Sequence, residues 1–192
     1  MDRVDVCDDM LRIVDYKSGK ADANLKELYY GEKLQLFLYA CAMEKCFDKK
    51  VVGEFYLPLH NAYTRELGNT YSLKGFFINE DFIVQSFDKR LVAGMKSDIV
   101  NVKLAKDGKA MKNSSKELES KEMTLLKNYS KVVSQKAYDE LSSGYIKPSP
   151  NDSNCMCEYC PYSAVCMRES NRYEVRAINK VDLTSFEEGE NG

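Results

Sequence analysis

The sequence of 192 residues lacks any apolar run that approaches the roughly 20 residues needed to cross a bilayer. It also lacks the basic and then apolar opening of a secretory leader, so we expect a cytoplasmic protein. Positive charge is not in excess either, because the formal net charge is -2. Such a chain has no overall attraction to nucleic acid, and any such contact would depend on local basic patches and on a bound metal ion.

Histidine is almost absent, and His60 is the only one. It follows a predicted strand at Val51–Leu59, where an ordinary strand-end histidine is favoured over a general base. A disulfide framework is also disfavoured, because no leader is visible, the seven cysteines are an odd number, and the chain is long enough for a proper core. One domain is the natural expectation for this length.

Two acids and a lysine stand out near the start of the chain. A hairpin turned near Cys7–Met10 would bring Asp2 beside Asp15 on the following strand. Because side chains alternate along a strand, Asp15 and Lys17 share one face, about 7 Å apart. Asp5 lies in the same first strand, but its place on the sheet is not clear enough to assign it to a metal.

This pattern suits metal-dependent hydrolysis of a phosphodiester. Mg²⁺ takes one or two carboxylates and fills its other positions with water and substrate oxygens, and Asp2 and Asp15 supply that number. The main-chain carbonyl of Tyr16 is a plausible further ligand. Lys17 would orient the attacking water, keep it partly deprotonated, or pair with the phosphate. The alternative is that Asp15–Gly19 simply ends a strand with ordinary turn residues.

A mostly apolar helix is predicted from about Tyr29 to Phe47, and it carries two polar groups on one face. Gln35 and Tyr39 are four residues apart, which places them side by side. One polar residue and one aromatic at a core boundary would be a common structural arrangement. Their position shortly after Asp15–Lys17 favours a role beside the acids instead.

Four cysteines fall within twelve positions near the C-terminus, which indicates a metal or cluster: Cys155, Cys157, Cys160 and Cys166. The last three suit either zinc or an iron-sulfur centre, and their spacing does not choose between the two. Between the hairpin and this cysteine loop, further strands are predicted at Val51–Leu59 and Tyr71–Ile78. A long core helix is predicted from about Lys121 to Ser143, ending at Gly144, whereas 112–121 is expected to be polar and mobile.

The motifs at Asp2–Asp5, Val14–Gly19 and Gln35–Tyr39 together resemble the RecB-like branch of the PD-(D/E)XK nucleases. With the cysteine loop, they are similar to the C-terminal nuclease domain of AddB-type subunits of bacterial AddAB helicase-nucleases. The resemblance implies an α/β restriction-endonuclease-like core, with a mixed central β-sheet flanked by helices, a long C-terminal helix and the cysteine loop. That domain would span 1–183, with the active-site hairpin at 1–17, the cysteine loop at 155–166 and a disordered acidic tail at 184–192.

The same resemblance implies roles for individual residues and a biological setting. Asp2 and Asp15 would bind Mg²⁺ or Mn²⁺, Lys17 would be the catalytic lysine, and Gln35 with Tyr39 would support the site and the DNA. The implied activity is a DNA exonuclease within an ATP-dependent helicase-nuclease of double-strand break repair and recombination. Its partner would be an AddA-like helicase-nuclease subunit.

In the family, three cysteines at this spacing join an upstream cysteine to hold a [4Fe-4S] cluster. Cys157, Cys160 and Cys166 match that pattern, whereas the upstream segment, which also carries a further active-site residue, does not precede Asp2 here. Cys155 is either a substitute ligand or incidental. We therefore expect the 192 residues alone to carry an incomplete cluster and to be weakly active or inactive.

Two other interpretations remain open. The chain could be a stand-alone RecB-like nuclease of the kind found in CRISPR systems or phages. Alternatively, it could be a non-catalytic DNA-binding module with a structural metal or cluster, in which the acids are remnants. Loss of metal-dependent cleavage on substitution of Asp15 and Lys17 would separate a nuclease from such a module, and co-purification with a helicase subunit would separate the two kinds of nuclease.

Overall fold

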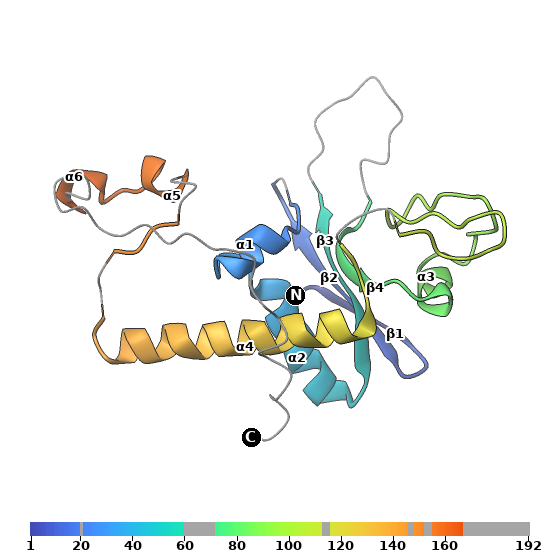
Figure 1. Cartoon of the computed structure of the whole chain (residues 1–192), viewed down its shortest axis with the longest axis horizontal. Helices are drawn as coiled ribbons and strands as arrows, with labels where there is room; N and C mark the ends of the chain where they lie inside the picture. Colours follow the sequence, from blue (N-terminus) through green and yellow to red (C-terminus); the bar gives the residue numbers. More distant parts are fainter. Residues whose placement is uncertain (20, 60–71, 113–115, 146–147, 152–154, 167–192) are drawn as a thin grey trace.

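A computed structural model describes residues 1–19, 21–59, 72–112, 116–145, 148–151 and 155–166 (Figure 1). His60 and the acidic tail at 184–192 lie outside these residues, and the expectations for them are not tested. Within the described part, no helix combines the length and the apolar character that crossing a bilayer requires.

The described chain is built on one five-stranded sheet in the order β1-β2-β3-β4-β5. β1 (Arg3–Cys7) runs antiparallel to β2 (Met10–Lys17), and β2 runs parallel to β3 (Lys50–Pro58). β4 (Lys74–Ile78) is antiparallel to β3, and the short β5 (Glu117–Leu118) is parallel to β4. The sheet is therefore mixed and carries helices, which confirms the expected α/β class.

Two helices make the crossover between the parallel strands β2 and β3. α1 (Leu25–Tyr29) begins at Asn24, whose side-chain oxygen accepts a hydrogen bond from the Lys26 amide. α2 (Gln35–Phe47) follows after a short connection. The single helix expected from Tyr29 to Phe47 is thus wrong at its start. Gly31 adopts a left-handed backbone conformation with φ of 76°, which interrupts the helix and lets α2 begin at Gln35.

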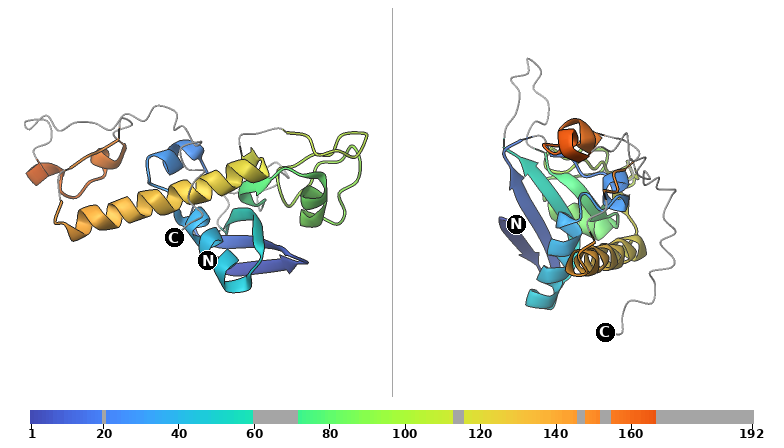
Figure 2. Two further views of the ribbon diagram at one scale, coloured as in Figure 1. Left: turned by 60° about the horizontal axis from the view of Figure 1, so that its bottom comes forward. Right: turned by 90° about the vertical axis from the view of Figure 1, so that its left-hand side faces the viewer.

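Helices cover both faces of the sheet (Figure 2). α2 packs against β2 and β3 and against the long α4 (Ser120–Ser142), and Phe37 of α2 lies 5.3 Å from Phe76 between ring centroids. α3 (Asp81–Phe87) covers the opposite face, where the Phe87 ring lies 5.6 Å from that of Phe55. Most of the buried apolar side chains form one core around these contacts.

A bulge sets which β3 side chains share a face with those of β2. The parallel register shifts between Leu11, which pairs with Val51, and Arg12, which pairs with Gly53. Beyond the shift, Asp15 lies opposite Tyr56. Because a one-residue shift moves every later side chain to the other face, this irregularity brings the Tyr56 side chain to the face of Asp15.

α4 confirms the expected long helix and ends, as expected, just before Gly144, which adopts φ of 76°. Core packing along its whole length is wrong, however. Leu126 is buried in the N-terminal half, whereas Leu141 is 74% exposed near the C-terminal end. The helix runs beyond the sheet there, as Figure 1 shows, so no strand lies beneath its C-terminal half.

The chain after α4 returns toward the crossover helices. The buried Asn151 amide donates a hydrogen bond to the Glu32 carboxylate, in the connection between α1 and α2. Two short helices then carry the cysteine loop, α5 (Cys155–Glu158) and α6 (Ser163–Cys166). The expectation of a polar, mobile segment at 112–121 is wrong at its end, because both residues of β5 are buried there.

Candidate active site

The hairpin of β1 and β2 places Asp2 and Asp15 on adjacent chain segments, as the sequence predicts. The Asp2 amide donates to the Val14 carbonyl at 3.1 Å, which continues the ladder of β1 and β2. The Asp2 carboxylate accepts a hydrogen bond from the Tyr16 amide at 2.6 Å. Asp2 is exposed and is thereby held at the carboxyl-terminal end of β2, next to Asp15.

Asp15 is the buried acid of the site, with 4% of its surface exposed. One carboxylate oxygen lies 2.6 Å from the Lys17 Nζ, and the other lies 2.9 Å from the amino group of Met1. Burial alone would raise the pKa of Asp15, but the hydrogen bonds from Lys17 and from that amino group outweigh it and hold the pKa below its ordinary value. Asp15 is therefore ionised at neutral pH and available to a cation.

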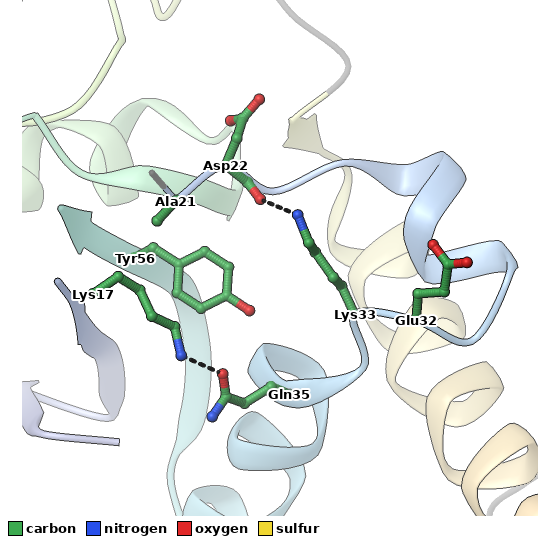
Figure 3. Close-up of a pocket in the computed structure, with 7 residues that line it drawn as sticks. All are labelled: Lys17, Ala21, Asp22, Glu32, Lys33, Gln35 and Tyr56. Carbon is green, nitrogen blue, oxygen red and sulfur yellow. Dashed lines mark hydrogen bonds between the residues drawn. The ribbon is translucent and has the colours of Figure 1, made fainter. Parts of the chain in front are cut away.

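Lys17 joins the hairpin to α2. Its ammonium donates to the Gln35 Oε1 at 2.8 Å, and the Gln35 amide nitrogen donates to the Tyr39 hydroxyl at 2.9 Å (Figure 3). The Gln35 contact and the Met1 amino group lower the pKa of the Tyr39 hydroxyl. Asp15, Lys17, Gln35 and Tyr39 thus form one continuous chain of polar contacts. Gln35 is the first residue of α2, so the helix start fixes its position.

A pocket of about 210 Å³ opens beside this chain of contacts. Two lysines, Lys17 and Lys33, line it together with the polar side chain of Gln35 and the ring of Tyr56 (Figure 3). Two carboxylates of the lining, Asp22 and Glu32, are engaged with other partners, Lys116 and Asn151 respectively. The pocket therefore presents basic and hydrogen-bonding groups to a ligand.

Two polar side chains of β3 lie on the site face and were not identified as site residues from the sequence. Tyr56 lies opposite Asp15, and Glu54 lies opposite Ile13. Glu54 is 0% exposed and points toward the helices, where burial raises the pKa of its carboxyl well above the ordinary value despite the nearby charge of Lys127. A strand of parallel register gives no sequence signal that would have marked either residue.

Asp5, the second acid of the first motif, is engaged elsewhere. Its carboxylate accepts two hydrogen bonds from Arg12, at 2.6 and 2.9 Å, and one from Arg3 at 2.6 Å. The Arg12 guanidinium also stacks 5.9 Å from the Phe87 ring centroid on the α3 face. Asp5 is therefore part of an ion-pair cluster on the face of the sheet opposite Asp15.

The donor set at the end of β2 is chemically suited to a hard divalent cation. Mg²⁺ prefers oxygen ligands and needs only one or two carboxylates, with water and substrate completing its shell. Asp15, ionised and buried, is such a ligand, and Asp2 is held beside it by the Tyr16 amide. The Tyr16 carbonyl lies in the strand between Asp15 and Lys17. These residues fit a magnesium or manganese ion.

The cysteine loop does not meet the same test. Cys157, Cys160 and Cys166 are free and partly buried, and all three lie on the short α5–α6 segment. Among the described residues, however, no three His, Cys, Asp or Glu side chains are close enough together to hold a metal ion. As placed here, the three thiols do not form the site of a cluster. The side chain of Cys155 is not among those the structure describes.

Comparison with known proteins agrees with this geometry. Residues 1–167 match the PD-(D/E)XK nuclease superfamily. The chain is also similar to several proteins that are each named as one subunit, the B-type one, of an ATP-dependent helicase/deoxyribonuclease. It is 30% identical to the one from Clostridium kluyveri over 91% of this chain and 18% of that protein, and 31% identical to the one from Caldanaerobacter subterraneus over 89% and 16%. For Clostridium tetani the identity is 32% over 86% and 16%.

A match over residues 1–167, together with the mixed sheet and the polar site at its edge, shows that the chain belongs to the PD-(D/E)XK nuclease superfamily. The chain spans 16–18% of the length of the three relatives compared. Their other activities therefore reside in a much longer polypeptide than the one described here.

Proposed function

We propose that this domain is a magnesium-dependent deoxyribonuclease that hydrolyses DNA phosphodiester bonds. The observation that carries the proposal is the direct contact of Lys17 with both Asp15 and Gln35, at 2.6 and 2.8 Å. These three residues come from a strand and a helix that are separate in the sequence. The superfamily match supports the same class of reaction.

Asp2, Asp15 and the Tyr16 carbonyl would hold the cation. A divalent cation at such a position supplies a more acidic water and shields the charge that develops on the phosphate oxygens. Lys17 presents a compact positive charge to the scissile phosphate at the mouth of the pocket. Gln35 and Tyr39 fix the direction of the lysine, because the Gln35 amide bonds to both.

We also propose that the domain works as the nuclease part of a helicase-nuclease, with DNA as substrate and an AddA-like subunit as partner. The names of the relatives support this proposal, since each is described as part of a helicase/deoxyribonuclease. Exonucleolytic action in double-strand break repair belongs to the same proposal. Co-purification with a helicase subunit tests it, and a nuclease that purifies and acts alone would point to a stand-alone enzyme.

A [4Fe-4S] cluster is part of this proposal only for a protein that brings a fourth thiolate to Cys157, Cys160 and Cys166. Four cysteine ligands are the usual requirement of such a cluster. Anaerobic reconstitution with iron and sulfide, followed by visible absorption and iron analysis, tests the capacity of the chain. A stable cluster on the 192 residues would show that Cys155 or another group completes the set.

The nuclease proposal is tested by single-turnover cleavage of end-labelled DNA with excess protein and either Mg²⁺, Mn²⁺ or EDTA. Asp15→Asn and Lys17→Met should each reduce the cleavage rate by at least about a hundredfold, the lower end of what one positioned charge contributes. Excess protein under single-turnover conditions keeps even slow cleavage measurable.

Two matched controls carry the same chemical changes away from the site. Asp9→Asn alters an exposed carboxylate in the turn of the same hairpin. Lys45→Met alters an exposed lysine of α2, ten residues and about 15 Å along the helix from Gln35. Both controls should cleave at the wild-type rate. Cleavage by Asp15→Asn equal to that of the controls would leave only a non-catalytic DNA-binding module.

A further inference from the structure

Tyr56 occupies a position on the site face that no motif marks. The parallel register of β2 and β3 pairs Tyr56 with Asp15, and paired residues of neighbouring strands project to the same side of a sheet. Its side chain is 5% exposed and lines the pocket beside Lys17 and Gln35 (Figure 3). Tyr56 is therefore a fixed, buried wall of the site.

The aromatic ring lies against the Lys17 ammonium. The distance from the Lys17 Nζ to the Tyr56 ring centroid is 5.1 Å, which is within the range of a cation–π contact. Lys17 has two other contacts here, Asp15 and Gln35. Asp15 is also the buried carboxylate that would bind the cation, so its contact with Lys17 competes with a second use. The ring has no such competing use.

The ring also stays in one chemical state. Burial, followed by the charge of Asp15, raises the pKa of the Tyr56 hydroxyl to about 12, so the side chain is neutral throughout the range in which DNA cleavage is measured. Among the described residues, the hydroxyl has no hydrogen-bond partner, and Figure 3 shows it directed into the pocket. What Tyr56 offers Lys17 is thus the face of its ring.

We propose that Tyr56 is a positioning residue of the nuclease site, whose ring holds the Lys17 ammonium at the mouth of the pocket. The inference rests on the proposed function, because Lys17 is positioned there for a substrate phosphate. The effect is on the lysine and not on DNA affinity, so it should appear in the rate of the bound complex.

The test compares three changes at one position in single-turnover cleavage at varied protein concentration. Tyr56→Phe keeps the ring and removes the hydroxyl. Tyr56→Leu removes the ring. Replacement of Tyr56 by pentafluorophenylalanine keeps the ring shape and inverts its charge distribution, so it remains informative if the leucine variant fails to fold. We expect the phenylalanine variant to cleave within about twofold of wild type, and the other two to lose about tenfold in maximal rate with unchanged half-saturation.

Phe76→Leu is the matched control, because Phe76 is a buried aromatic of the adjacent strand that packs on Phe37 and not on Lys17. It should keep the wild-type maximal rate. An equal loss in Phe76→Leu would make the effect one of general packing. An equal loss in Tyr56→Phe would assign the role to the hydroxyl. Either result would overturn the proposal.

A second measurement does not depend on cleavage. The ring current of Tyr56 should shift the Lys17 ε-methylene protons upfield in the NMR spectrum, and this shift should persist in Tyr56→Phe and vanish in Tyr56→Leu. If wild-type protein shows the shift but cleaves no DNA with any divalent metal, the proposed function fails while the contact stands. A Lys17 signal that is the same in Tyr56→Leu would refute the positioning role.

Discussion

Glu54 allows a stability prediction that is independent of activity. The side chain is 0% exposed, and neither carboxylate oxygen has a hydrogen-bond partner among the described residues. A buried polar group without a partner costs about 1–3 kcal/mol in folded proteins. Glu54→Met, which is apolar and of similar volume, should therefore increase the free energy of unfolding by about 1–3 kcal/mol at pH 7.

The nearby lysine does not lose its partner in this variant. The Lys127 ammonium lies 2.5 Å from the Glu44 carboxylate, and that ion pair connects α4 to α2. Glu44→Gln is consequently the contrasting change, since it leaves Lys127, which is itself buried, without its bonded carboxylate. We expect Glu44→Gln to destabilise the protein where Glu54→Met stabilises it.

The pH dependence follows from the raised pKa of Glu54. Burial and the Glu44 charge raise it well above the ordinary value of 4.5, against the attraction of Lys127. The folded state therefore holds its proton more tightly than the unfolded state. Its stability contribution is fully present below the unfolded pKa, falls by about 1.4 kcal/mol per pH unit above it, and levels off beyond the folded pKa.

Chemical denaturation between pH 4 and pH 9, followed by far-ultraviolet circular dichroism, measures these effects. Glu54→Gln cannot ionise, so its advantage over wild type should be smallest near pH 4 and grow as the pH rises. A difference between the two proteins that does not change with pH would refute the buried, protonated carboxyl. A Glu54→Met protein less stable than wild type at pH 7 would show that Glu54 is held by an ion pair with Lys127.

Two other predictions concern the sheet. Gly75→Ala should lower the free energy of unfolding by at least about 2 kcal/mol, because a Cβ there would meet the Glu54 carbonyl oxygen at 1.9 Å; a thermal melt unchanged from wild type would contradict the close strand approach. Arg12→Leu should cost about 1–2 kcal/mol in denaturant unfolding through loss of the charged hydrogen bonds to Asp5, with no change in single-turnover cleavage. A cleavage defect in folded Arg12→Leu would place this cluster in the site.

Local spacing was enough to predict part of the site. Alternation along one strand correctly placed Asp15 and Lys17 on the same face, and the four-residue spacing of Gln35 and Tyr39 correctly placed them side by side. Which helix residue meets which strand residue is a tertiary property. The sequence suggested that meeting only through its resemblance to a family.

The remaining features depend on contacts between distant segments. The position of Tyr56 opposite Asp15 requires both a parallel pairing and a bulge, and neither has a local sequence pattern. β5 has only two residues, in a polar stretch, and pairs with a strand almost forty positions earlier. The apolar residues at the end of α4 have helical spacing, but that spacing does not reveal that the sheet ends before Leu141.

The central claim is that Asp2 and Asp15 hold a divalent ion beside Lys17. Crystals grown with Mn²⁺ test it most directly, because the ion is located by its anomalous scattering. We expect one peak within about 2.0–2.3 Å of carboxylate oxygens of both aspartates, as is usual for an oxygen-ligated divalent ion, and no peak there in Asp15→Asn crystals. A well-ordered wild-type site without such a peak, or manganese bound elsewhere only, would contradict the account.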